Sequence, residues 1–427
     1  MRMFGSPGRL PATGDRVLAV IFLLTFVAAA CGSAERVSMP STTTVPVPTT
    51  RPTTTVSDLA TTVAWTTTMS TTTSTTTTST STSTTLATTS TLTPGPSAAE
   101  CVADLPVGLR VGQVLLPLAT QAELPVVADL ASRGLVAGVV VVGAVGDGFP
   151  MAVAAVQDVS ATGPVMVAVD EEGGRVQRFQ AMLGSMPSAA EMAALPVDVV
   201  RAMATERAEA LAELGVTVVL APVLDVGGSP GIGDRSFSDD PEVVSTHGIA
   251  FVEGLMAGGL VPVVKHFPGH GRANADSHDE LATTPPLDEL WEVDLLPFVL
   301  TPDGAAVMVG HLAVPGLTGG VPATLSPAAV TGLLRDDLGF DGVVVTDDLA
   351  MGAVADLVDV ATAARLALIA GADLLMIGGL ANVVPAAWSL VAALDDGSLD
   401  ERWLDEAVER VLAMRGVDPC TLVLREG

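Results

Sequence analysis

Residues suited to proton transfer gather in one short stretch of the chain. Residues 265–271 read KHFPGHG, and Asp276 and His278 follow soon after. Lys265 is the only lysine among the 20 Lys and Arg residues, which indicates a position that needs a compact ammonium, for example to donate to sugar hydroxyls. An Asp two residues before a His can accept the imidazole N–H and fix its tautomer, so that the ring can donate a proton near neutral pH. Few apolar residues stand between Gly271 and Leu281, so we expect Asp276 and His278 to lie on a mobile loop. An isolated Asp-x-His pattern is also typical of a loop that is simply exposed to solvent.

A second candidate group is the pair of carboxylates Asp347 and Asp348, which directly follows the apolar run 343–345 and Thr346. A carboxylate at the end of a buried strand can attack the anomeric carbon of a sugar and form a covalent glycosyl-enzyme, which divides one displacement into two easier steps. Adjacent side chains on extended backbone point in opposite directions. We therefore place Asp347 in the site and expect Asp348 to cap the following helix.

Polar residues also stand where other apolar runs end. In a parallel barrel the carboxyl ends of all strands point to one rim, so these separated positions are expected to meet at one mouth, where barrel enzymes keep their chemistry. Any single one of them could instead cap a helix or end strand pairing. The set consists of Asp170, Asp225, Lys265, His266, His311, Asp347 and Asp348.

The elements that must carry these residues are short, Val-rich runs that alternate with helix-compatible segments. This alternation predicts an α/β fold with a parallel sheet, and eight runs favour a single closed (β/α)8 TIM barrel over an open doubly wound sheet. Hydrophobic residues make up 49% of the chain, aromatic residues 3%, and Tyr is absent, so branched aliphatic side chains must fill the core. The predicted strands are Gln113–Leu118, Gly138–Val142, Val165–Asp170, Thr217–Asp225, Val261–His266, Ala306–His311, Gly342–Asp347 and Asp373–Gly378; helix-compatible segments include Val199–Leu214, Val358–Ala370, Val383–Leu394 and Asp400–Met414.

The N-terminal residues predict export from the cytoplasm. A short arginine-containing segment precedes the apolar run Val17–Ala30, and this run is too short for a confident membrane span, which is the order of a signal peptide. Residues 28–31 read AAAC and resemble a bacterial lipobox, in which case Cys31 becomes the lipidated first residue of the mature protein. An ordinary secretory signal with cleavage nearby is the alternative.

The next segment is almost entirely Thr, Ser and Pro between about Ser41 and Pro96. It cannot bury enough apolar area to offset the entropy of ordering, so we expect a disordered stalk, similar in composition to an O-glycosylated spacer. We therefore divide the chain into a lipoprotein signal peptide at 1–31, a disordered linker at 32–97 and the barrel at 98–427. Cys101 and Cys420 bracket the barrel and can form a disulfide outside the cytoplasm; two unpaired thiols are the alternative.

The formal charge of −28 at pH 7 restricts the partners of the protein. Such a chain is repelled by nucleic acids and by anionic membrane surfaces. We expect no nucleic-acid partner, membrane contact only through the lipid anchor, and a monomer with neither a metal nor a cofactor.

The motifs resemble those of glycoside hydrolase family 3 enzymes of the β-N-acetylhexosaminidase type, and the resemblance covers essentially the whole predicted barrel. The matching segments are Val169–Arg178, Ala221–Val226, Gly233–Phe237, Lys265–Gly271 with Asp276 and His278, and Thr346–Met351.

This resemblance implies a role for each matching residue. Asp347 is expected to be the nucleophile, His278 the proton donor and Asp276 its partner, with retention of anomeric configuration. The residues expected to hold the terminal sugar are Asp170, Arg178, Arg235, Lys265 and His266. The implied activity is removal of terminal β-linked N-acetylglucosamine. The lipobox and the stalk resemble secreted actinobacterial members, so the expected substrates are peptidoglycan fragments such as muropeptides, outside the membrane.

Three other functions are consistent with parts of the pattern. A metal-dependent barrel hydrolase could use His266, His270, His278 and Asp276 as zinc ligands, although no His-x-His pair ends an early strand and Lys265 would be repelled by the cation. A phosphorylase, or a hydrolase of another β-glycoside, could share the fold and the nucleophile, and an imidazole donor does not repel phosphate. A wall-anchored lipoprotein that binds glycans without catalysis is the third.

Overall fold

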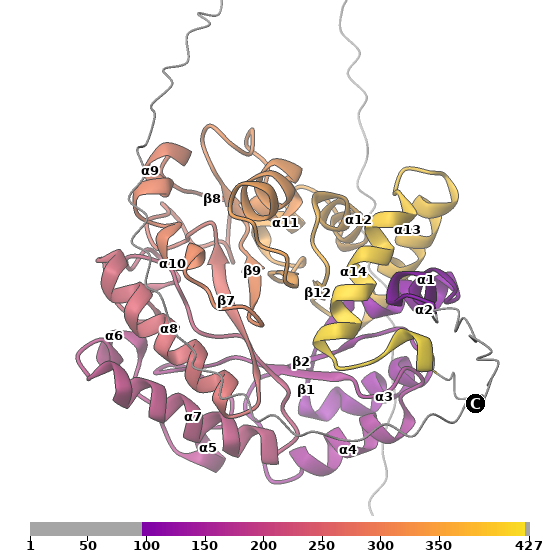
Figure 1. The fold of residues 1–427 in the computed structure, drawn as a ribbon, viewed down its shortest axis with the longest axis horizontal. Helices are drawn as coiled ribbons and strands as arrows, with labels where there is room; N and C mark the ends of the chain where they lie inside the picture. The colour runs from indigo at the N-terminus through magenta and orange to yellow at the C-terminus, as the bar shows by residue number, and fades with distance from the viewer. Residues whose placement is uncertain (1–95, 423–427) are drawn as a thin grey trace, which may run out of the picture. The chain divides into compact units, whose positions relative to one another are not determined.

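Eight parallel strands form the centre of the domain, and helices surround them (Figure 1). The computed structural model describes residues 96–422. The predicted signal peptide, with its Cys31, and the Thr/Ser/Pro-rich segment up to residue 95 therefore lie outside the described residues. Of the helices within residues 96–422, none has the length and apolar character needed to cross a membrane.

The strands follow one another around the sheet in chain order. Each pairs in parallel with its neighbours in the order β11-β9-β7-β6-β3-β2-β1-β12. A bridge between Val345 and Leu374 joins β11 to the start of β12, so the ring is almost completely closed. The strands are β1 (Leu115–Thr120), β2 (Gly138–Val142), β3 (Met166–Val169), β6 (Val218–Val219), β7 (Val261–Phe267), β9 (Ala306–Val309), β11 (Val344–Thr346) and β12 (Leu375–Ile377).

All eight predicted strands overlap strands of the barrel, and their ends differ by a few residues. Gln113 closes a helix, α2 (Val107–Gln113), instead of opening a strand. The predicted strand Thr217–Asp225 is hydrogen-bonded as a strand only at Val218–Val219, and Val223 makes a single further bridge to Lys265. The prediction of an α/β barrel is therefore confirmed, and five of the eight strands are shorter than the apolar runs indicate.

Aliphatic side chains fill both faces of the sheet, as the composition predicts. On β2, Val139 and Val141 belong to the cluster between sheet and helices, whereas Val140 points into the barrel. This alternation explains why the strands read as continuous apolar runs, since neither face meets water. The inner cluster also contains Met308 and Met376, which reach the base of the cavity described below.

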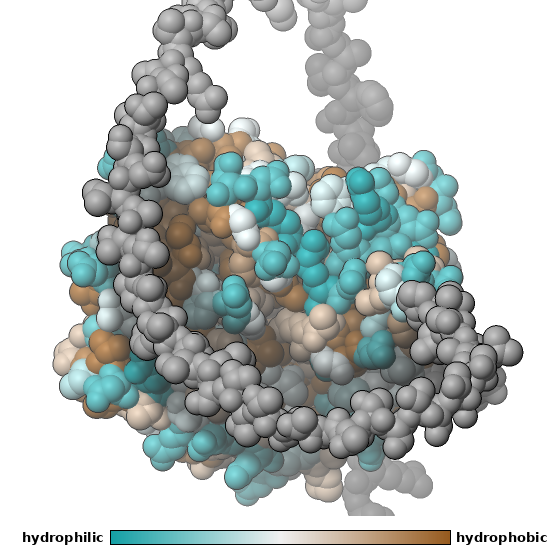
Figure 2. All heavy atoms as spheres, viewed as in Figure 1, coloured by the Kyte–Doolittle hydropathy of each residue, from teal (hydrophilic) through white to brown (hydrophobic). Residues whose placement is uncertain are grey.

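The surrounding helices bury one stripe each, and α14 (Glu401–Met414) shows the principle. Asp400 caps its first turn by accepting the backbone N–H of Arg402. Its buried residues are Leu404, Ala407, Val408, Val411 and Leu412, the three- and four-residue spacing of an amphipathic helix. Figure 2 shows hydrophilic residues gathered over the outer face of this helix.

The remaining elements complete the ring. The longer helices are α3 (Leu124–Ser132), α4 (Phe149–Val159), α7 (Val197–Glu213), α8 (Pro241–Ala257), α12 (Val360–Ala370) and α13 (Val383–Asp395); a π-helical segment, η4 (Ala328–Asp337), stands between β9 and β11. The shorter helices are α1 (Ala98–Ala103), α5 (Gln180–Leu183), α6 (Ala189–Met192), α9 (Leu287–Glu292), α10 (Leu296–Val299) and α11 (Gly352–Ala355). The 3-10 turns are η1 (Gln121–Glu123), η2 (Gly233–Arg235), η3 (Ala323–Leu325), η5 (Leu380–Asn382) and η6 (Pro419–Thr421), and two small sheets pair β4 (Glu171–Gly173) with β5 (Val176–Gln177) and β8 (Ala282–Thr283) with β10 (Leu312–Ala313).

The first and last segments of the domain lie together. Helix α1 packs against α14 and η6, and a disulfide joins Cys101 in α1 to Cys420 in η6. The sequence left open either a disulfide or two unpaired thiols for these cysteines, and the structure contains the disulfide.

Candidate active site

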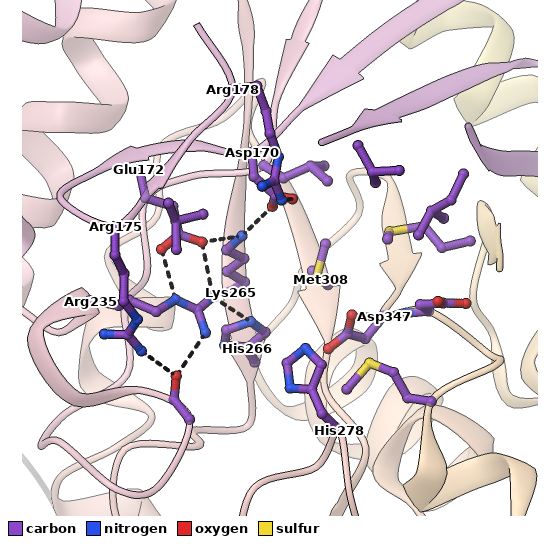
Figure 3. A pocket seen from close by; sticks show the side chains of 18 residues that line it. Asp170, Glu172, Arg175, Arg178, Arg235, Lys265, His266, His278, Met308 and Asp347 are labelled. Carbon is purple, nitrogen blue, oxygen red and sulfur yellow. Dashed lines mark hydrogen bonds and ion pairs between the residues drawn. The ribbon is translucent and has the colours of Figure 1, made fainter. Parts of the chain in front are cut away.

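A cavity of about 440 Å³ opens at the carboxyl ends of the barrel strands (Figure 3). Seven of the eight residues predicted for the site line it, and the eighth, Asp276, contacts His278. The lining residues that carry charged or titratable groups are Asp170, Glu172, Arg175, Arg178, Arg235, Lys265, His266, His278, Asp347 and Asp348. Residues separated by almost 180 positions in the chain therefore meet at one mouth, as the positions of the strand ends predict.

One wall of the cavity is a buried ion-pair cluster centred on Lys265. The ammonium lies 2.8 Å from Oδ1 of Asp170, which follows β3, and 2.5 Å from Oε1 of Glu172 in β4. Lys265 is the fifth of the seven residues of β7 and is 2% exposed. A compact ammonium can reach both carboxylates at this depth, which gives a physical reason for the single lysine of the chain.

Two arginines extend this wall. Arg178 donates from Nη2 to Asp170 at 2.7 Å. Arg235, in η2, forms a two-point pair with Glu172, with Nε–Oε2 at 2.8 Å and Nη2–Oε1 at 2.9 Å. The two parallel bonds fix the plane of the guanidinium at the cavity surface.

The ion pairs keep Asp170, Glu172 and Lys265 charged. Burial alone would raise the pKa of Asp170, but the charges of Lys265 and Arg178 outweigh it and hold that pKa well below the ordinary 3.8. Burial acts on Glu172 in the same direction, and there Lys265 and Arg235 lower the pKa. For Lys265 burial favours the neutral form, yet the two carboxylates raise its pKa. The wall thus combines three cations with two anions, and its donors can bind hydroxyl oxygens.

His266 is held by a carboxylate behind it. Nδ1 of His266 lies 2.7 Å from Oδ2 of Asp225, and the backbone N–H of His266 donates to Oδ1 at 3.2 Å. Asp225 is fully buried. Because the carboxylate accepts, Nδ1 carries the proton, and Nε2 is left on the side of the cavity, 3.4 Å from Nη2 of Arg235.

Asp347 follows β11 and points into the cavity across from this wall (Figure 3). The backbone N–H of Asp348 donates to Oδ1 of Asp347 at 2.8 Å. Burial would raise the pKa of Asp347, but the imidazoles of His311 and His266 and this N–H hold it below 3.8. The side chain is therefore a carboxylate at neutral pH, as a nucleophile must be.

Asp348 has a different role from the one expected. Its carboxylate accepts the backbone N–H of Ala350 at 2.9 Å, but α11 begins later and its N-cap residue is Met351. Asp348 thus closes the turn before the helix and does not cap the helix itself. Its carbonyl accepts from Nε2 of His311 at 2.9 Å, and this bond fixes the backbone next to Asp347.

His278 and Asp276 lie on the loop between β7 and β8. Oδ1 of Asp276 accepts from Nδ1 of His278 at 2.8 Å and from the backbone N–H of His278 at 3.0 Å. The imidazole is the more exposed of the two side chains and faces the cavity. Burial would raise the pKa of Asp276, but these two hydrogen bonds lower it, so the carboxylate stays charged and fixes the ring with Nε2 free.

The arrangement fits substitution at a sugar carbon. It offers a carboxylate, an imidazole with one free nitrogen, and a wall of fixed donors within one cavity. Within residues 96–422, no group of three or more His, Cys, Asp and Glu side chains is placed to hold a metal ion.

Glu172 and Arg175 were not predicted as site residues, and Asp225 was expected at the barrel mouth but without a specific role. Glu172 balances Lys265 and Arg235, and Asp225 orients His266. Arg175 donates to the carbonyls of Gly231 and Ile232 and pairs with Asp234, so it ties the β4–β5 hairpin to η2. The signals were present, since Asp225 ends a predicted strand and the other two lie in the segment Val169–Arg178.

Comparison with known proteins gives a consistent result. The model of the glycosyl hydrolase family 3 N-terminal domain matches residues 127–414. Beta-hexosaminidase LpqI of Mycobacterium tuberculosis is 45% identical over 269 residues, which are 60% of this chain and 69% of that protein; the solved structure of M. tuberculosis LpqI matches with a TM-score of 0.70 and 38% identity over 75% of this chain and 97% of that chain.

Two further solved structures are similar. One is a glycosyl hydrolase of family 3 from Mycobacterium smegmatis, with a TM-score of 0.69 and 40% identity over 73% of this chain and 98% of that chain. The other is a family 3 beta-N-acetylglucosaminidase from Paenibacillus, with a TM-score of 0.69 and 31% identity over 73% of this chain and 62% of that chain. The chain therefore belongs to glycosyl hydrolase family 3.

Proposed function

We propose that this protein is a retaining, exo-acting β-N-acetylglucosaminidase. The observation that carries the proposal is the meeting of Asp347 and the Asp276-bound His278 in one cavity with the ion-pair wall of Lys265. The names of the similar proteins, Beta-hexosaminidase and beta-N-acetylglucosaminidase, support this activity.

In the first step the carboxylate of Asp347 attacks C1 of the terminal sugar. The bond between C1 and the aglycone oxygen breaks, its electron pair leaves with that oxygen, and the proton on Nε2 of His278 moves to it. Asp276 stabilises the charged imidazole before this transfer. The product is a covalent glycosyl-enzyme on Asp347.

In the second step a water molecule attacks C1 and the bond to Asp347 breaks. His278, now neutral, takes the proton of that water. Two inversions give net retention of configuration. Throughout both steps, the sugar hydroxyls are held by five side chains: Asp170, Arg178, Arg235, Lys265 and His266.

We also propose that the enzyme acts outside the cytoplasm on peptidoglycan fragments. It would be anchored by a lipid on Cys31, with a Thr/Ser/Pro-rich linker at 32–97 before the catalytic barrel at 98–427. The lipobox-like AAAC at 28–31 and the Thr/Ser/Pro-rich segment support this location. The bond between Cys101 and Cys420 supports it independently, because such bonds persist in oxidising compartments.

The activity is tested by assaying the full-length chain, purified in detergent, on 4-nitrophenyl β-glycosides with and without the 2-acetamido group. We expect turnover of the N-acetylglucosaminide, unchanged by EDTA and equal in phosphate and phosphate-free buffers. Glycosyl phosphate as the product would identify a phosphorylase, loss with EDTA and return with zinc a metal hydrolase, and sugar binding without turnover a binding lipoprotein.

The nucleophile is tested by trapping with 5-fluoro-N-acetylglucosaminyl fluoride and peptide mapping by mass spectrometry. The adduct should lie on the peptide that contains Asp347. An adduct on any other peptide would contradict the mechanism.

The anchor is tested with the variant Cys31→Ala. The unmodified chain should sediment with membranes and carry a metabolically incorporated acyl group, whereas the variant should do neither. Equal sedimentation of both would rule out lipidation at this cysteine.

A further inference from the structure

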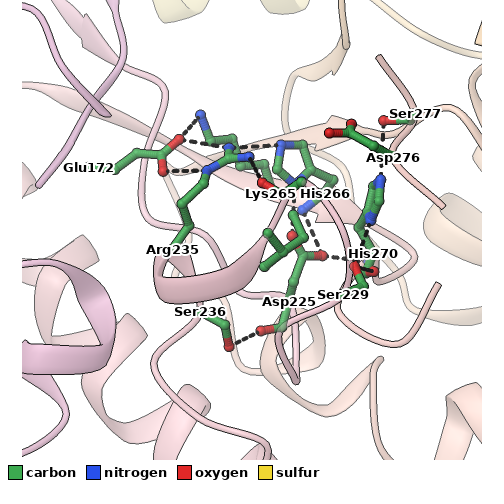
Figure 4. A network of polar contacts seen from close by, with 12 residues as sticks. Glu172, Asp225, Ser229, Arg235, Ser236, Lys265, His266, His270, Asp276 and Ser277 are labelled. Carbon is green, nitrogen blue, oxygen red and sulfur yellow. Dashed lines mark hydrogen bonds and ion pairs between the residues drawn. The ribbon is translucent and has the colours of Figure 1, made fainter. Parts of the chain in front are cut away.

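Ser277 stands between Asp276 and His278 and faces the opposite way. The side chains of Asp276 and His278 are 30% and 64% exposed, whereas Ser277 is 3% exposed. Its hydroxyl lies 3.1 Å from Nε2 of His270 (Figure 4). The loop therefore turns one polar side chain into the protein between the two that it presents to the cavity.

The hydrogen bonds around His270 define which nitrogen carries its proton. Oγ of Ser229 donates to the carbonyl of His270 at 2.6 Å and lies 3.2 Å from Nδ1. Since the only hydroxyl proton of Ser229 is used, Nδ1–H donates to that oxygen, and Nε2 accepts from the hydroxyl of Ser277. Burial lowers the pKa of His270, which is consistent with this neutral form.

The backbone of His270 is held by the same carboxylate that orients His266. Its backbone N–H donates to Oδ1 of Asp225 at 2.6 Å, and Oδ2 of the same carboxylate accepts from His266. One buried carboxylate thus sets both the ring of His266 and the backbone from which His270 reaches the loop.

Two further contacts limit where the loop can lie. The carbonyl of His278 accepts the backbone N–H of Gly352, at the start of α11, at 3.1 Å. On the other side, the backbone at Gly231 lies close to Asp276: a Cβ added at this glycine would come within 2.7 Å of the carboxylate. The loop is therefore packed between the segment that follows Asp347 and the segment before Arg235, and Ser277 is its inward attachment.

We propose that His270 is a positioning residue, which acts through Ser277 to hold the Asp276–His278 pair over the cavity. This inference rests on the proposed function, in which His278 must meet the leaving oxygen. The hydrogen bond between Ser277 and His270 contributes to proton transfer only by positioning His278. Its loss should therefore lower the rate only for substrates whose leaving group needs a proton.

The variant Ser277→Ala removes the hydroxyl and little volume. For a disaccharide substrate we expect kcat/KM to fall about 5- to 10-fold, the factor that one hydrogen bond provides. For the 2,4-dinitrophenyl N-acetylglucosaminide, whose leaving group departs without a proton, kcat/KM should change by less than about 2-fold. The matched control is Ser245→Ala, which removes another buried hydroxyl, bonded to the carbonyl of Pro241 in α8, and should change neither rate.

A second pair of variants keeps the test open if Ser277→Ala has a small effect. His270→Leu removes both ring nitrogens, whereas His270→Gln keeps an amide oxygen that can accept from Ser277. The glutamine variant should recover most of the disaccharide activity that the leucine variant loses. Equal losses of both variants on both substrates would overturn the positioning role.

Hydrogen–deuterium exchange provides a measurement that does not depend on activity. Peptides covering 271–282 should exchange faster in Ser277→Ala than in the unsubstituted protein or in Ser245→Ala. Unchanged exchange would overturn the proposal. An unsubstituted protein that is inactive on every N-acetylglucosaminide would instead overturn the proposed function, while the exchange data would still decide whether His270 holds the loop.

Discussion

Nδ1 of His278 lies 2.8 Å from Oδ1 of Asp276, and the same oxygen accepts the backbone N–H of His278. One carboxylate oxygen therefore sets both the backbone and the ring of the proposed proton donor. A loop-borne imidazole can hold a defined orientation in this way although most of its surface is exposed. The first prediction concerns this pair.

Replacing His278 by Ala should separate substrates by their need for a proton. On a disaccharide, kcat/KM should fall by about 10²- to 10⁴-fold, the range for loss of a general acid. On the 2,4-dinitrophenyl substrate the first step should be nearly unchanged. Steady-state kinetics on both substrates measures this, with Glu280→Gln, an exposed change on the same loop, as the control. Equal losses on both substrates would argue against a proton-donating role.

The pH dependence of the His278→Ala variant should report the nucleophile. In this variant, kcat/KM for the 2,4-dinitrophenyl substrate no longer depends on a proton donor and requires Asp347 to be ionised. His311, His266 and the backbone N–H of Asp348, which lower the pKa of Asp347 more than His278 does, remain in this variant. The carboxylate should therefore stay ionised as pH falls from 7, and the rate should decrease only below about pH 4. Samples returned from low pH to pH 7 should recover full activity, which controls for unfolding. A decrease centred well above pH 4 would contradict this prediction.

Removing the carboxylate at position 347 should abolish turnover without unfolding the barrel. We expect Asp347→Ala to retain less than about one part in 10⁴ of the activity on unactivated substrates. Added azide should enter the vacated space and yield the α-glycosyl azide from the 2,4-dinitrophenyl substrate, which NMR identifies. Asp348→Asn keeps an acceptor for the N–H of Ala350 and should lose far less. A β-glycosyl azide would place the nucleophile elsewhere.

The charge of Lys265 should matter for stability as well as for binding. Lys265→Met leaves the carboxylates of Asp170 and Glu172 without their shared cation, and breaking such a buried pair costs about 3–5 kcal/mol of unfolding free energy. Lys265→Arg keeps the charge and should cost less, but its planar fork cannot reproduce both contacts, so KM should rise in both variants. Urea denaturation and steady-state kinetics measure the two effects.

The stability difference between the Lys265→Met variant and the unsubstituted protein should depend on pH with a defined sign. Asp170 and Glu172 have lower pKa values in the folded protein than their ordinary values of 3.8 and 4.5. Their contribution to the unfolding free energy is therefore complete when the pH lies above these ordinary values. It is lost as pH falls through the folded values. The difference should therefore narrow below about pH 4.5, and a difference that widens on acidification would contradict the ion-pair account.

The strands and the rim were predictable because their signals are local. Each buried strand must be apolar on both faces, and each polar residue that ends one, such as Asp170 or His311, is carried to the same rim by parallel pairing. Family resemblance added the expected roles. Lys265 was conspicuous because no other lysine exists.

Other features depend on how distant segments fold together. Glu172 meets Lys265 only because the β4–β5 hairpin folds back over the barrel mouth, and no local pattern in the chain specifies that. His270 was considered as a zinc ligand type, whereas it bonds Ser229 and Ser277. The loop described as mobile from its few apolar residues is attached through Ser277, which a hydropathy pattern does not reveal.

The disulfide should add to the stability of the barrel. Cys101 and Cys420 are separated by 319 residues, and joining the ends of so long a segment restricts the unfolded chain. The double variant Cys101→Ser, Cys420→Ser should lose about 2–4 kcal/mol of unfolding free energy, measured by urea denaturation without reductant. Dithiothreitol should lower the stability of the unsubstituted protein to that of the variant and leave the variant unchanged.

The same bond changes what a protease can achieve. A single cut anywhere between residues 101 and 420 would leave two fragments that remain covalently connected, and both would stay attached to the N-terminal segment. With the N-terminal lipid anchor proposed above, a nicked barrel would stay attached to the membrane. Its release would require either a cut before Cys101 or reduction of the bond together with unfolding.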